Sequence, residues 1–553
     1  MHRHESLGEM LLAAAESARA DAGYRFLDGS ASRLLTFPEL AAAAQRGAAH
    51  LQAQGLTTGE RVLVILTTGA DFAVAYYAAV LCGAVPCVLA APGLGNAADG
   101  LERIGKVAAQ LDARHLIARA SHLATWLPGL PALRGLPAEE IVAGSDALWT
   151  PVAVRSTDLA YIQATSGSTG LPKCVALTHG NLLANLEQIG RALRFTEDDV
   201  LVGWLPLFHD MGLIGCFLQT TYWRFTGVLM SPYRFLRQPV SFLQAISEYR
   251  GTSSGNPTFA YALMASRVSD AELAALDLSS WTRALCGSEP VSTEALERFA
   301  QKFRPCGFSG HRFVPCYGLA EASLAVTMHP LGAPLRTEQI DRTALAHGLA
   351  EPGGTDGVRV ADCGPPVEGT QVAIRDDADA VLPEGVVGHI WVAGPSVMQS
   401  YFQAEAATAE TLQDGWLRTG DLGYLRDGRL LVTGRQKELV IIRGQKWPPT
   451  DFELAAAEVA PGRVVAFGVA EAETGTEGLC ILCEEPRQPG ADLAALGAAV
   501  QRHVITRTGV LPARVEWIPR NALPHTTSGK LQRSKARELY LAGSLARPTA
   551  KPA

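Results

Sequence analysis

The sequence predicts an α/β protein with a large N-terminal domain of helix-covered, parallel-type sheets and a smaller α+β domain after it. Three observations lead to this expectation. From about residue 35 onward, amphipathic helix-like segments alternate with short apolar runs, a pattern typical of sheets with helices on both faces. The chain has 553 residues, more than one hydrophobic core usually organises. The alternation also restarts after an irregular stretch and a group of short strands.

The first elements can be assigned from their patterns. The segment FPELAAAAQRGAAHLQAQG (37–55) predicts an amphipathic helix that ends at a glycine, and RVLVILT (61–67) predicts a strand. The apolar stretch 72–91 is long enough to cross a membrane. Because Gly83 and Pro86 interrupt it, we expect a buried helix followed by a strand and no integral membrane segment.

The second half of the chain divides into three parts. Residues 330–363 are rich in Gly and Pro and predict an insertion with a short helical piece. Short strands such as QVAIRD (371–376) then predict a small β subdomain. The last part contains strands such as GLCILCEE (478–485) and helical segments such as 449–459. We therefore expect an N-terminal domain over 1–436 and a small, mobile C-terminal domain over 437–553.

Composition excludes several classes of function. The net charge of −7 and pI near 6.0 do not support nucleic-acid binding, which requires a basic face. Cys480 and Cys483 form a CxxC inside an apolar run, without a second cysteine or histidine pair to complete a zinc site. The N-terminus lacks the apolar core of a signal peptide. We expect reduced thiols in a cytoplasmic protein.

The segment TSGSTGLPKC (165–174) predicts a phosphate-binding loop. Its small residues offer backbone N–H groups and hydroxyls to an anion, and Lys173 adds a positive charge. A Walker A loop requires glycine immediately before its lysine, where this chain has Pro172. The loop is therefore not that of a P-loop NTPase, and a flexible Gly/Ser connection is the alternative.

The loop belongs to an ordered set of motifs. YIQATSGSTGLPKCVALTHGNL (161–182) resembles the nucleotide-binding signature of the adenylate-forming (ANL) superfamily, which includes acyl-CoA synthetases, peptide-synthetase adenylation domains and luciferases. Five further matches follow in the order found in that superfamily: CGSEP (286–290), CYGLAEASLAVT (316–327), WLRTGDLGYL (416–425), GRQKELVIIRGQKWPP (434–449) and LPHTTSGKLQRSKAR (523–537). Together they cover nearly the whole chain.

The resemblance implies a reaction that joins a carboxylate to the α-phosphate of ATP and expels pyrophosphate. It assigns Lys530 and Lys173 to catalysis, Glu321 to Mg²⁺ and Lys437 to the hinge between the domains. Tyr317 would stack on the adenine, and Asp421 would accept hydrogen bonds from the ribose hydroxyls. The nucleotide-binding set it implies is Thr165, Ser166, Gly167, Ser168, Thr169, Gly170, Gly287, Ser288, Glu289, Cys316, Tyr317, Gly318, Ala320, Asp421 and Arg435.

A further motif narrows the family. WLPLFHDMGLIGCFL (204–218) resembles fatty acyl-AMP ligases, which pass the acyl group to the phosphopantetheine thiol of an acyl carrier protein. In that branch His209 would line the approach of the carboxylate, although a histidine that caps a helix is the alternative. Met211 and Ile214 would line the acyl tunnel, although core packing would give the same pattern. The irregular stretch 330–363 falls where the branch carries a segment thought to hinder transfer to free CoA.

Several alternatives remain at this stage. The chain could be an ordinary acyl-CoA synthetase, or it could adenylate an aryl acid or an amino acid, with Asp210 binding the α-amino group. A non-catalytic nucleotide-binding relative is a more distant possibility. One departure from the family pattern is Lys446-Trp447-Pro448, which suggests a different partner-facing surface. No carrier domain is fused within the sequence, so we expect delivery to a separate carrier protein.

Overall fold

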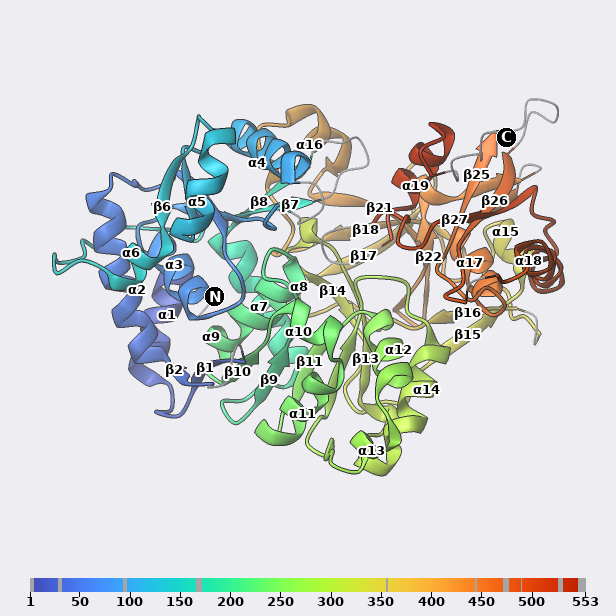
Figure 1. The fold of residues 1–553 in the computed structure, drawn as a ribbon, viewed down its shortest axis with the longest axis horizontal. Helices are drawn as coiled ribbons and strands as arrows, with labels where there is room; N and C mark the ends of the chain where they lie inside the picture. The colour runs from blue at the N-terminus through green and yellow to red at the C-terminus, as the bar shows by residue number, and fades with distance from the viewer. Residues whose placement is uncertain are drawn as a thin grey trace. The chain divides into compact units, whose positions relative to one another are not determined.

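The protein is described by a computed structural model, which divides into two compact units. The first unit comprises Met1–Leu335, Cys363–Val372 and Val392–Arg418, and the second comprises Arg336–Asp362, Ala373–Trp391 and Thr419–Ala553. The predicted α/β class is confirmed (Figure 1), while the predicted domain boundary after residue 436 remains a prediction. The residues that the structure describes are 4–27, 32–92, 97–165, 172–354, 357–442, 445–470, 477–488, 490–525 and 531–545.

The largest sheet of the first unit has eight strands in the order β14-β13-β12-β11-β9-β10-β1-β2. Its six central strands are parallel, and the edge strands β2 and β14 are antiparallel to their neighbours. The strands are β1 (Gly23–Phe26), β2 (Leu34–Thr36), β9 (Val200–Gly203), β10 (Thr226–Leu229), β11 (Ser253–Asn256), β12 (Arg283–Cys286), β13 (Phe313–Gly318) and β14 (Ala325–Met328). The sheet is therefore parallel in its centre, as predicted.

A second sheet of the first unit is fully parallel, with the order β4-β3-β5-β6. Its strands are β3 (Arg61–Ile65), β4 (Val85–Val88), β5 (His115–Ala118) and β6 (Arg134–Pro137). A third, antiparallel sheet has the order β19-β8-β7, with β7 (Leu159–Thr165), β8 (Lys173–Thr178) and β19 (Ser400–Tyr401). This third sheet positions the phosphate-loop motif.

Two predicted helices show why the N-terminal pattern is informative. Helix α2 (Phe37–Ala53) begins at Thr36, whose side chain forms a reciprocal capping box with Glu39, and it ends within two residues of the predicted glycine stop. Helix α3 (Ala70–Leu81) is buried along the apolar run and is followed by β4, as predicted. No helix among the described residues is long and apolar enough to cross a membrane.

The remaining helices of the first unit enclose its core. In Figure 1, α11, α12 and α14 lie beside the strands of the large sheet, and α2, α3 and α6 pack together. The core between that sheet and its helices includes Trp204, Tyr261 and Trp281. The helices are α1 (Leu7–Ser17), α4 (Ala97–Leu111), α5 (Ala120–Trp126), α6 (Ala138–Ala143), α7 (His179–Leu193), α8 (Asp210–Gly212), α9 (Gln219–Trp223), α10 (Pro232–Arg237), α11 (Val240–Tyr249), α12 (Thr258–Arg267), α13 (Asp270–Leu273), α14 (Thr293–Phe303) and α16 (Glu405–Thr411).

The short strands after the predicted insertion form a five-stranded sheet, β17-β18-β21-β20 with β22 on β21. This confirms a β-rich region there. The unit boundary falls inside three of its strands. The strands are β17 (Gln371–Arg375), β18 (Gly388–Ala393), β20 (Leu412–Gln413), β21 (Trp416–Arg426) and β22 (Arg429–Arg435).

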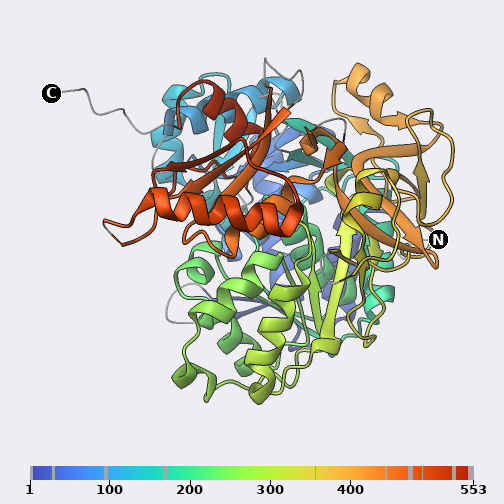
Figure 2. The same ribbon diagram turned by 90° about the vertical axis from the view of Figure 1, so that its right-hand side faces the viewer.

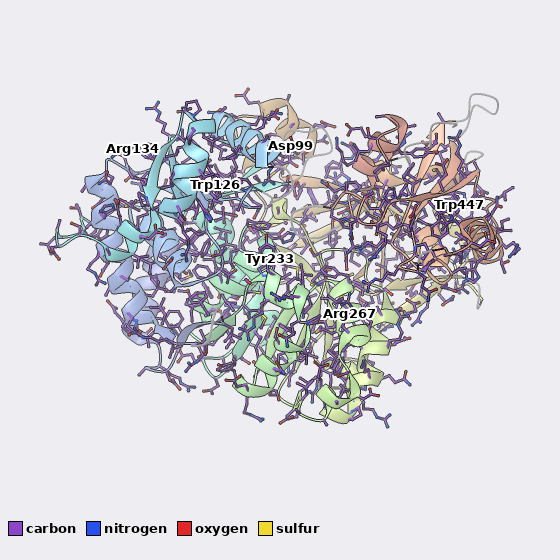
Figure 3. The ribbon with its side chains drawn as sticks, in the orientation of Figure 1. Asp99, Trp126, Arg134, Tyr233, Arg267 and Trp447 are labelled. Atoms are coloured by element: carbon purple, nitrogen blue, oxygen red, sulfur yellow. The ribbon has the colours of Figure 1, made fainter. Side chains whose placement is uncertain are left out.

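The C-terminal part of the second unit is a small α+β structure, as predicted. Figure 2 shows α18 along one face of the sheet β25-β26-β27. Cys480 and Cys483 are both buried on β26. Trp447, labelled in Figure 3, is buried against Phe452, so the tryptophan of this departure from the family pattern lies in a core. The elements are β23 (Val440–Ile442), β24 (Gln445–Trp447), α17 (Pro449–Ala457), β25 (Val464–Ala470), β26 (Glu477–Glu484), α18 (Leu493–Thr508), β27 (Arg514–Ile518) and α19 (Arg533–Leu541).

Candidate active site

The two ends of the phosphate-loop motif lie on two strands that pair with each other in antiparallel orientation. β7 ends at Thr165 and β8 begins at Lys173, and these two residues are paired across the strands. The Thr165 hydroxyl also donates to the Lys173 carbonyl oxygen at 3.1 Å. Both residues are therefore held at the mouth of the loop. The predicted ligands Ser166, Gly167, Ser168, Thr169 and Gly170 lie outside the described residues.

A tyrosine that the sequence reasoning missed connects two predicted site residues. The Tyr401 hydroxyl donates to Glu321 Oε1 at 2.8 Å, and the Lys173 ammonium lies 4.4 Å from the centre of the Tyr401 ring. Burial and the neighbouring Glu321 raise the pKa of Tyr401 well above its usual value, so the hydroxyl stays protonated and can donate. The structure thus brings the cation of the loop and the predicted metal ligand to the same side chain.

Glu321 lies on a short 3₁₀ helix, η5 (Ala320–Ala322), in a tight turn after β13. The turn requires glycine at position 318, because a Cβ there would lie 1.8 Å from the Leu324 carbonyl oxygen. The Met398 amide donates to the Glu321 carbonyl oxygen at 2.7 Å, and the Ser323 hydroxyl donates to the Ser396 carbonyl oxygen at 2.8 Å. The loop that carries Glu321 is therefore fixed along its backbone.

The residues present fit a magnesium ion. Mg²⁺ is usually held by one or two carboxylates together with water and substrate phosphate oxygens, and Glu321 supplies one oriented carboxylate near Lys173. Among the described residues, no group of three or more His, Cys, Asp or Glu side chains could hold a metal ion by itself. This arrangement suits a cation that arrives with a nucleotide.

Two of the segments that supply predicted nucleotide-binding residues, 286–290 and 316–327, touch each other. Gly287 follows β12, and a Cβ at this position would lie 2.8 Å from Cys316 Sγ and 2.9 Å from the Cys316 carbonyl oxygen. Ser288 has a positive φ of 75°. Glu289 Oε1 accepts a 2.6 Å hydrogen bond from the Phe259 amide in the first turn of α12, which anchors the segment. Tyr317, Gly318 and Ala320 follow Cys316 on β13 and in the turn after it.

His209 and Asp210 begin the segment that is predicted to hold the acid. His209 is the N-cap of α8, its Nδ1 accepts from the Met211 amide at 3.3 Å, and it lies 2.6 Å from Asp210 Oδ1. The capping histidine that the sequence offered as an alternative is therefore present, and a role toward the carboxylate remains a prediction. Asp210 also accepts from the Met211 amide at 2.7 Å, so its carboxylate already has partners.

The two predicted tunnel residues are buried. Ile214 lies on a π-helix, η2 (Leu213–Leu218), and is fully enclosed. The terminal methyl group of Met211 lies 3.2 Å from the position that a Cβ on Gly255 would occupy. Short π-helical segments occur frequently at functional sites. The burial of Met211 and Ile214 fits both a tunnel wall and plain core packing, so their role in an acyl tunnel remains a prediction.

In the second unit, Asp421 and Arg435 form an ion pair. They face each other across β21 and β22, with Arg435 Nε 2.8 Å from Asp421 Oδ1. Asp421 is buried, whereas 62% of the Arg435 side chain is exposed. Lys437 is exposed on the following 3₁₀ helix, η6 (Gln436–Glu438). The roles of Asp421 and Arg435 toward the nucleotide and the hinge role of Lys437 remain predictions.

The predicted catalytic Lys530 lies outside the described residues, and the contacts nearest to it are made by His525, Leu531 and Arg533. His525 and Leu531 form a β-bridge. Arg533 donates two hydrogen bonds of 2.7 Å to Glu453 and one of 2.6 Å to Glu438. The terminal lysine motif is therefore tied to the residue that follows Lys437.

The predicted insertion contains more regular structure than expected. It forms a hairpin of β15 (Thr337–Ile340) and β16 (Val358–Ala361) with helix α15 (Arg342–Ala346) between them. Glu338 accepts from the Tyr424 hydroxyl at 3.0 Å, and Arg342 lies 3.2 Å from Asp451 in the first turn of α17. Gly and Pro residues around two strands of only four residues each concealed the hairpin from pattern reading. The insertion is thus bound to α17 by an ion pair.

The Arg342–Asp451 contact gives a pH-dependent prediction. Burial raises the pKa of Asp451 from 3.8 to about 6, although Arg342 lowers it. The native state then keeps a proton that the unfolded chain has released, so stability falls as the pH rises through this range. We expect the free energy of unfolding to drop by about 3 kcal/mol between about pH 4 and pH 7 from this group.

Urea unfolding of Asp451→Asn checks this prediction, because the variant should lose that pH dependence. Asp379→Asn, in an exposed turn, is the matched control and should keep it. An Asp451→Asn protein with an unchanged pH profile would contradict the assignment.

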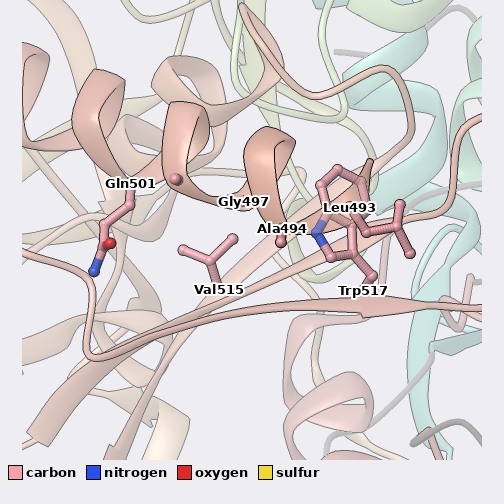
Figure 4. Close-up of a pocket in the computed structure, with 7 residues that line it drawn as sticks. Leu493, Ala494, Gly497, Gln501, Val515 and Trp517 are labelled. Atoms are coloured by element: carbon pink, nitrogen blue, oxygen red, sulfur yellow. The ribbon is translucent and has the colours of Figure 1, made fainter. Parts of the chain in front are cut away.

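A pocket of about 410 Å³ lies elsewhere in the second unit, between α18 and β27 (Figure 4). Leu493, Gly497, Gln501 and Trp517 are among the residues that line it. The described lining has one amide side chain and no charged group, so it does not suit a nucleotide phosphate. None of the predicted site residues lines it.

Comparisons with known proteins agree with the family resemblance of the sequence motifs. Residues 14–402 match the family model described as AMP-binding enzyme. A Caulobacter vibrioides protein, provisionally named as an acyl-CoA synthetase, is 37% identical over 513 residues, or 90% of this chain and 88% of that protein. The medium-chain fatty acid–[acyl-carrier-protein] ligase JamA of Moorena producens is 33% identical over 96% of this chain and 94% of its own length.

A solved structure from a study of fatty acyl-adenylate ligases of E. coli and L. pneumophila is also similar. It superimposes with a TM-score of 0.92 and 32% identity, and the match covers 98% of both chains.

Proposed function

Because the chain belongs to the AMP-binding enzyme family, within the adenylate-forming superfamily, we propose that it is a fatty acyl-AMP ligase. It uses ATP to convert a fatty acid to acyl-AMP and pyrophosphate. It then transfers the acyl group to the phosphopantetheine thiol of a separate acyl carrier protein. The observation that carries the nucleotide chemistry is the contact of both Lys173 and Glu321 with Tyr401.

The first half-reaction brings two anions together. A carboxylate oxygen attacks the α-phosphorus of ATP, the bond to the β-phosphate oxygen breaks, and pyrophosphate leaves. Positive groups that are already oriented stabilise the charge that builds up on the phosphates. Lys173 supplies such a charge at the mouth of the loop, and Lys530 supplies a second one in this proposal. Mg²⁺, held by Glu321, would neutralise phosphate charge.

In the second half-reaction the carrier thiol, as its thiolate, attacks the acyl carbon and AMP leaves. In the family resemblance, the domain 437–553 moves about Lys437 between the two steps, and we propose the same movement here. The Asp421–Arg435 pair lies directly before this hinge. Its carboxylate would accept the ribose hydroxyls, and Tyr317 would stack on the adenine.

The acceptor distinguishes the ligase from an acyl-CoA synthetase. The segment 330–363 lies at the position of the ligase-specific insertion, and its hairpin contacts α17 through Arg342 and Asp451. JamA is named for transfer to an acyl carrier protein, whereas the Caulobacter relative carries a synthetase name. We favour the carrier protein because the insertion is anchored to the part of the chain that moves in this proposal.

The cytoplasmic location remains a prediction.

Product identification tests the first half-reaction. The purified protein, with Mg-ATP and a panel of fatty, aryl and amino acids, is expected to form acyl-AMP with medium- or long-chain fatty acids, detected by mass spectrometry. Adenylates of aryl or amino acids alone would overturn the fatty-acid assignment. Absence of any adenylate would overturn the enzymatic proposal.

A further inference from the structure

Tyr401 contacts two groups of the proposed reaction without belonging to any motif that predicts the site. Its side chain is 4% exposed, its hydroxyl donates to Glu321 Oε1 at 2.8 Å, and its ring lies 4.4 Å from the Lys173 ammonium. We propose that Tyr401 is a positioning residue that orients Glu321 toward a divalent cation and Lys173 toward the nucleotide phosphates. This inference rests on the proposed function.

The backbone of Tyr401 is fixed independently of its side chain. Strand β19 pairs with β8 so that Tyr401 faces Val175, and the Phe402 amide donates to the Cys174 carbonyl oxygen at 2.7 Å. The Tyr401 amide also donates to the Thr408 hydroxyl at 3.0 Å. These bonds hold the ring beside the first residue of β8, which is Lys173. The tyrosine can therefore act as a rigid support.

The hydroxyl and the ring have separate effects. A hydrogen bond to one carboxylate oxygen restricts the rotation of Glu321, and loss of such a partner typically weakens metal binding 10- to 100-fold. The ring attracts the Lys173 ammonium through its π-electrons, which limits the positions that this flexible side chain adopts. Loss of the hydroxyl should therefore weaken binding of the cation, and loss of the ring should weaken binding of the nucleotide phosphates.

Removal of the hydroxyl should not release the loop that carries Glu321. The Met398 amide holds the Glu321 carbonyl oxygen, and the Ser323 hydroxyl holds the Ser396 carbonyl oxygen. Asn181 also donates to the carbonyl oxygens of Pro395 and Val397 at 2.8 and 2.9 Å. Tyr401→Phe thus changes the freedom of the Glu321 side chain while the loop keeps its backbone contacts.

Binding experiments on the full chain separate these effects from turnover. The probe is Mn²⁺ with the non-cleavable nucleotide α,β-methylene-ATP, because the electron paramagnetic resonance signal of free Mn²⁺ falls when the ion binds and Mn²⁺ accepts the same oxygen ligands as Mg²⁺. We expect Tyr401→Phe to lower the affinity for Mn²⁺ about 10-fold. Its affinity for the nucleotide in EDTA, measured by calorimetry, should be unchanged. Tyr401→Leu should weaken both. Tyr424→Phe removes a comparable hydrogen bond to Glu338 and should change neither.

The outcomes distinguish the inference from the proposed function. Wild-type or tighter Mn²⁺ binding by Tyr401→Phe would overturn the positioning role, because the hydroxyl would then be neutral or a competitor of the cation. A wild-type protein that binds Mn²⁺ and nucleotide but adenylates no acid would overturn the ligase proposal alone. If Tyr401→Leu does not fold, as judged by circular dichroism, Tyr401→Phe still decides the role of the hydroxyl because it keeps the ring.

Discussion

Glu321→Gln is expected to slow acyl-AMP formation about 100-fold, the effect of losing one oriented electrostatic group in an active site. The amide oxygen can still accept the hydrogen bond from Tyr401, so the shape of the site is kept while the negative charge is lost. The remaining groups then hold the cation and its phosphates less firmly. The rate of ATP–pyrophosphate exchange with a saturating fatty acid measures the change.

The control for this prediction is Glu368→Gln. Glu368 forms a surface ion pair with Arg191 at 3.0 Å and is 67% exposed, and such pairs contribute little. Its exchange rate should equal that of the wild type. A Glu321→Gln protein with full activity would show that Glu321 does not hold the cation.

Arg533→Met is expected to destabilise the second unit by about 3 kcal/mol, the lower end of the cost of removing one partner from a buried ion pair, because Arg533 and its two partners are only partly buried. Burial lowers the pKa of Arg533, but Glu453 and Glu438 raise it well above its usual value. Its loss would leave both carboxylates without their cation, and the forked contact with Glu453 needs a guanidinium. Urea unfolding followed by tryptophan fluorescence, to which Trp447 and Trp517 of this unit contribute, measures the effect.

The matched control is Lys535→Met on the same helix. Lys535 and Glu538 form an exposed pair at 2.9 Å, so the variant should stay within about 0.5 kcal/mol of the wild type. An Arg533→Met protein as stable as this control would show that the terminal motif is not anchored through Arg533. Arg533→Lys should fall between the two, because it keeps the charge but not the fork.

Local patterns predicted much of the fold. The helix at 37–55 followed from its periodicity and glycine stop, and the structure adds the capping box that starts it. The apolar run 72–91 was resolved by Gly83 and Pro86 into a helix and a strand, as observed. The hairpin within 330–363 was missed because its strands are short and only partly buried.

The candidate site was predicted where its residues belong to contiguous motifs. Lys173 and Glu321 were proposed in this way, but Tyr401, which contacts both of them, was not. Tyr401 is 80 residues from Glu321 in sequence, and Arg533 is 80 residues from Glu453. Such contacts depend on strand pairing and helix packing over long separations, which a single sequence does not reveal.

The identity of the acyl acceptor tests the central proposal most directly. Acyl-AMP formed by the wild-type protein would be offered CoA in one reaction and a pantetheinylated acyl carrier protein in another, with mass spectrometry of both products. A carrier thioester, with little or no acyl-CoA, is the result that a fatty acyl-AMP ligase predicts, and deletion of 330–363 should then allow CoA transfer. Ready acyl-CoA formation by the intact chain would contradict the ligase assignment and make it an acyl-CoA synthetase.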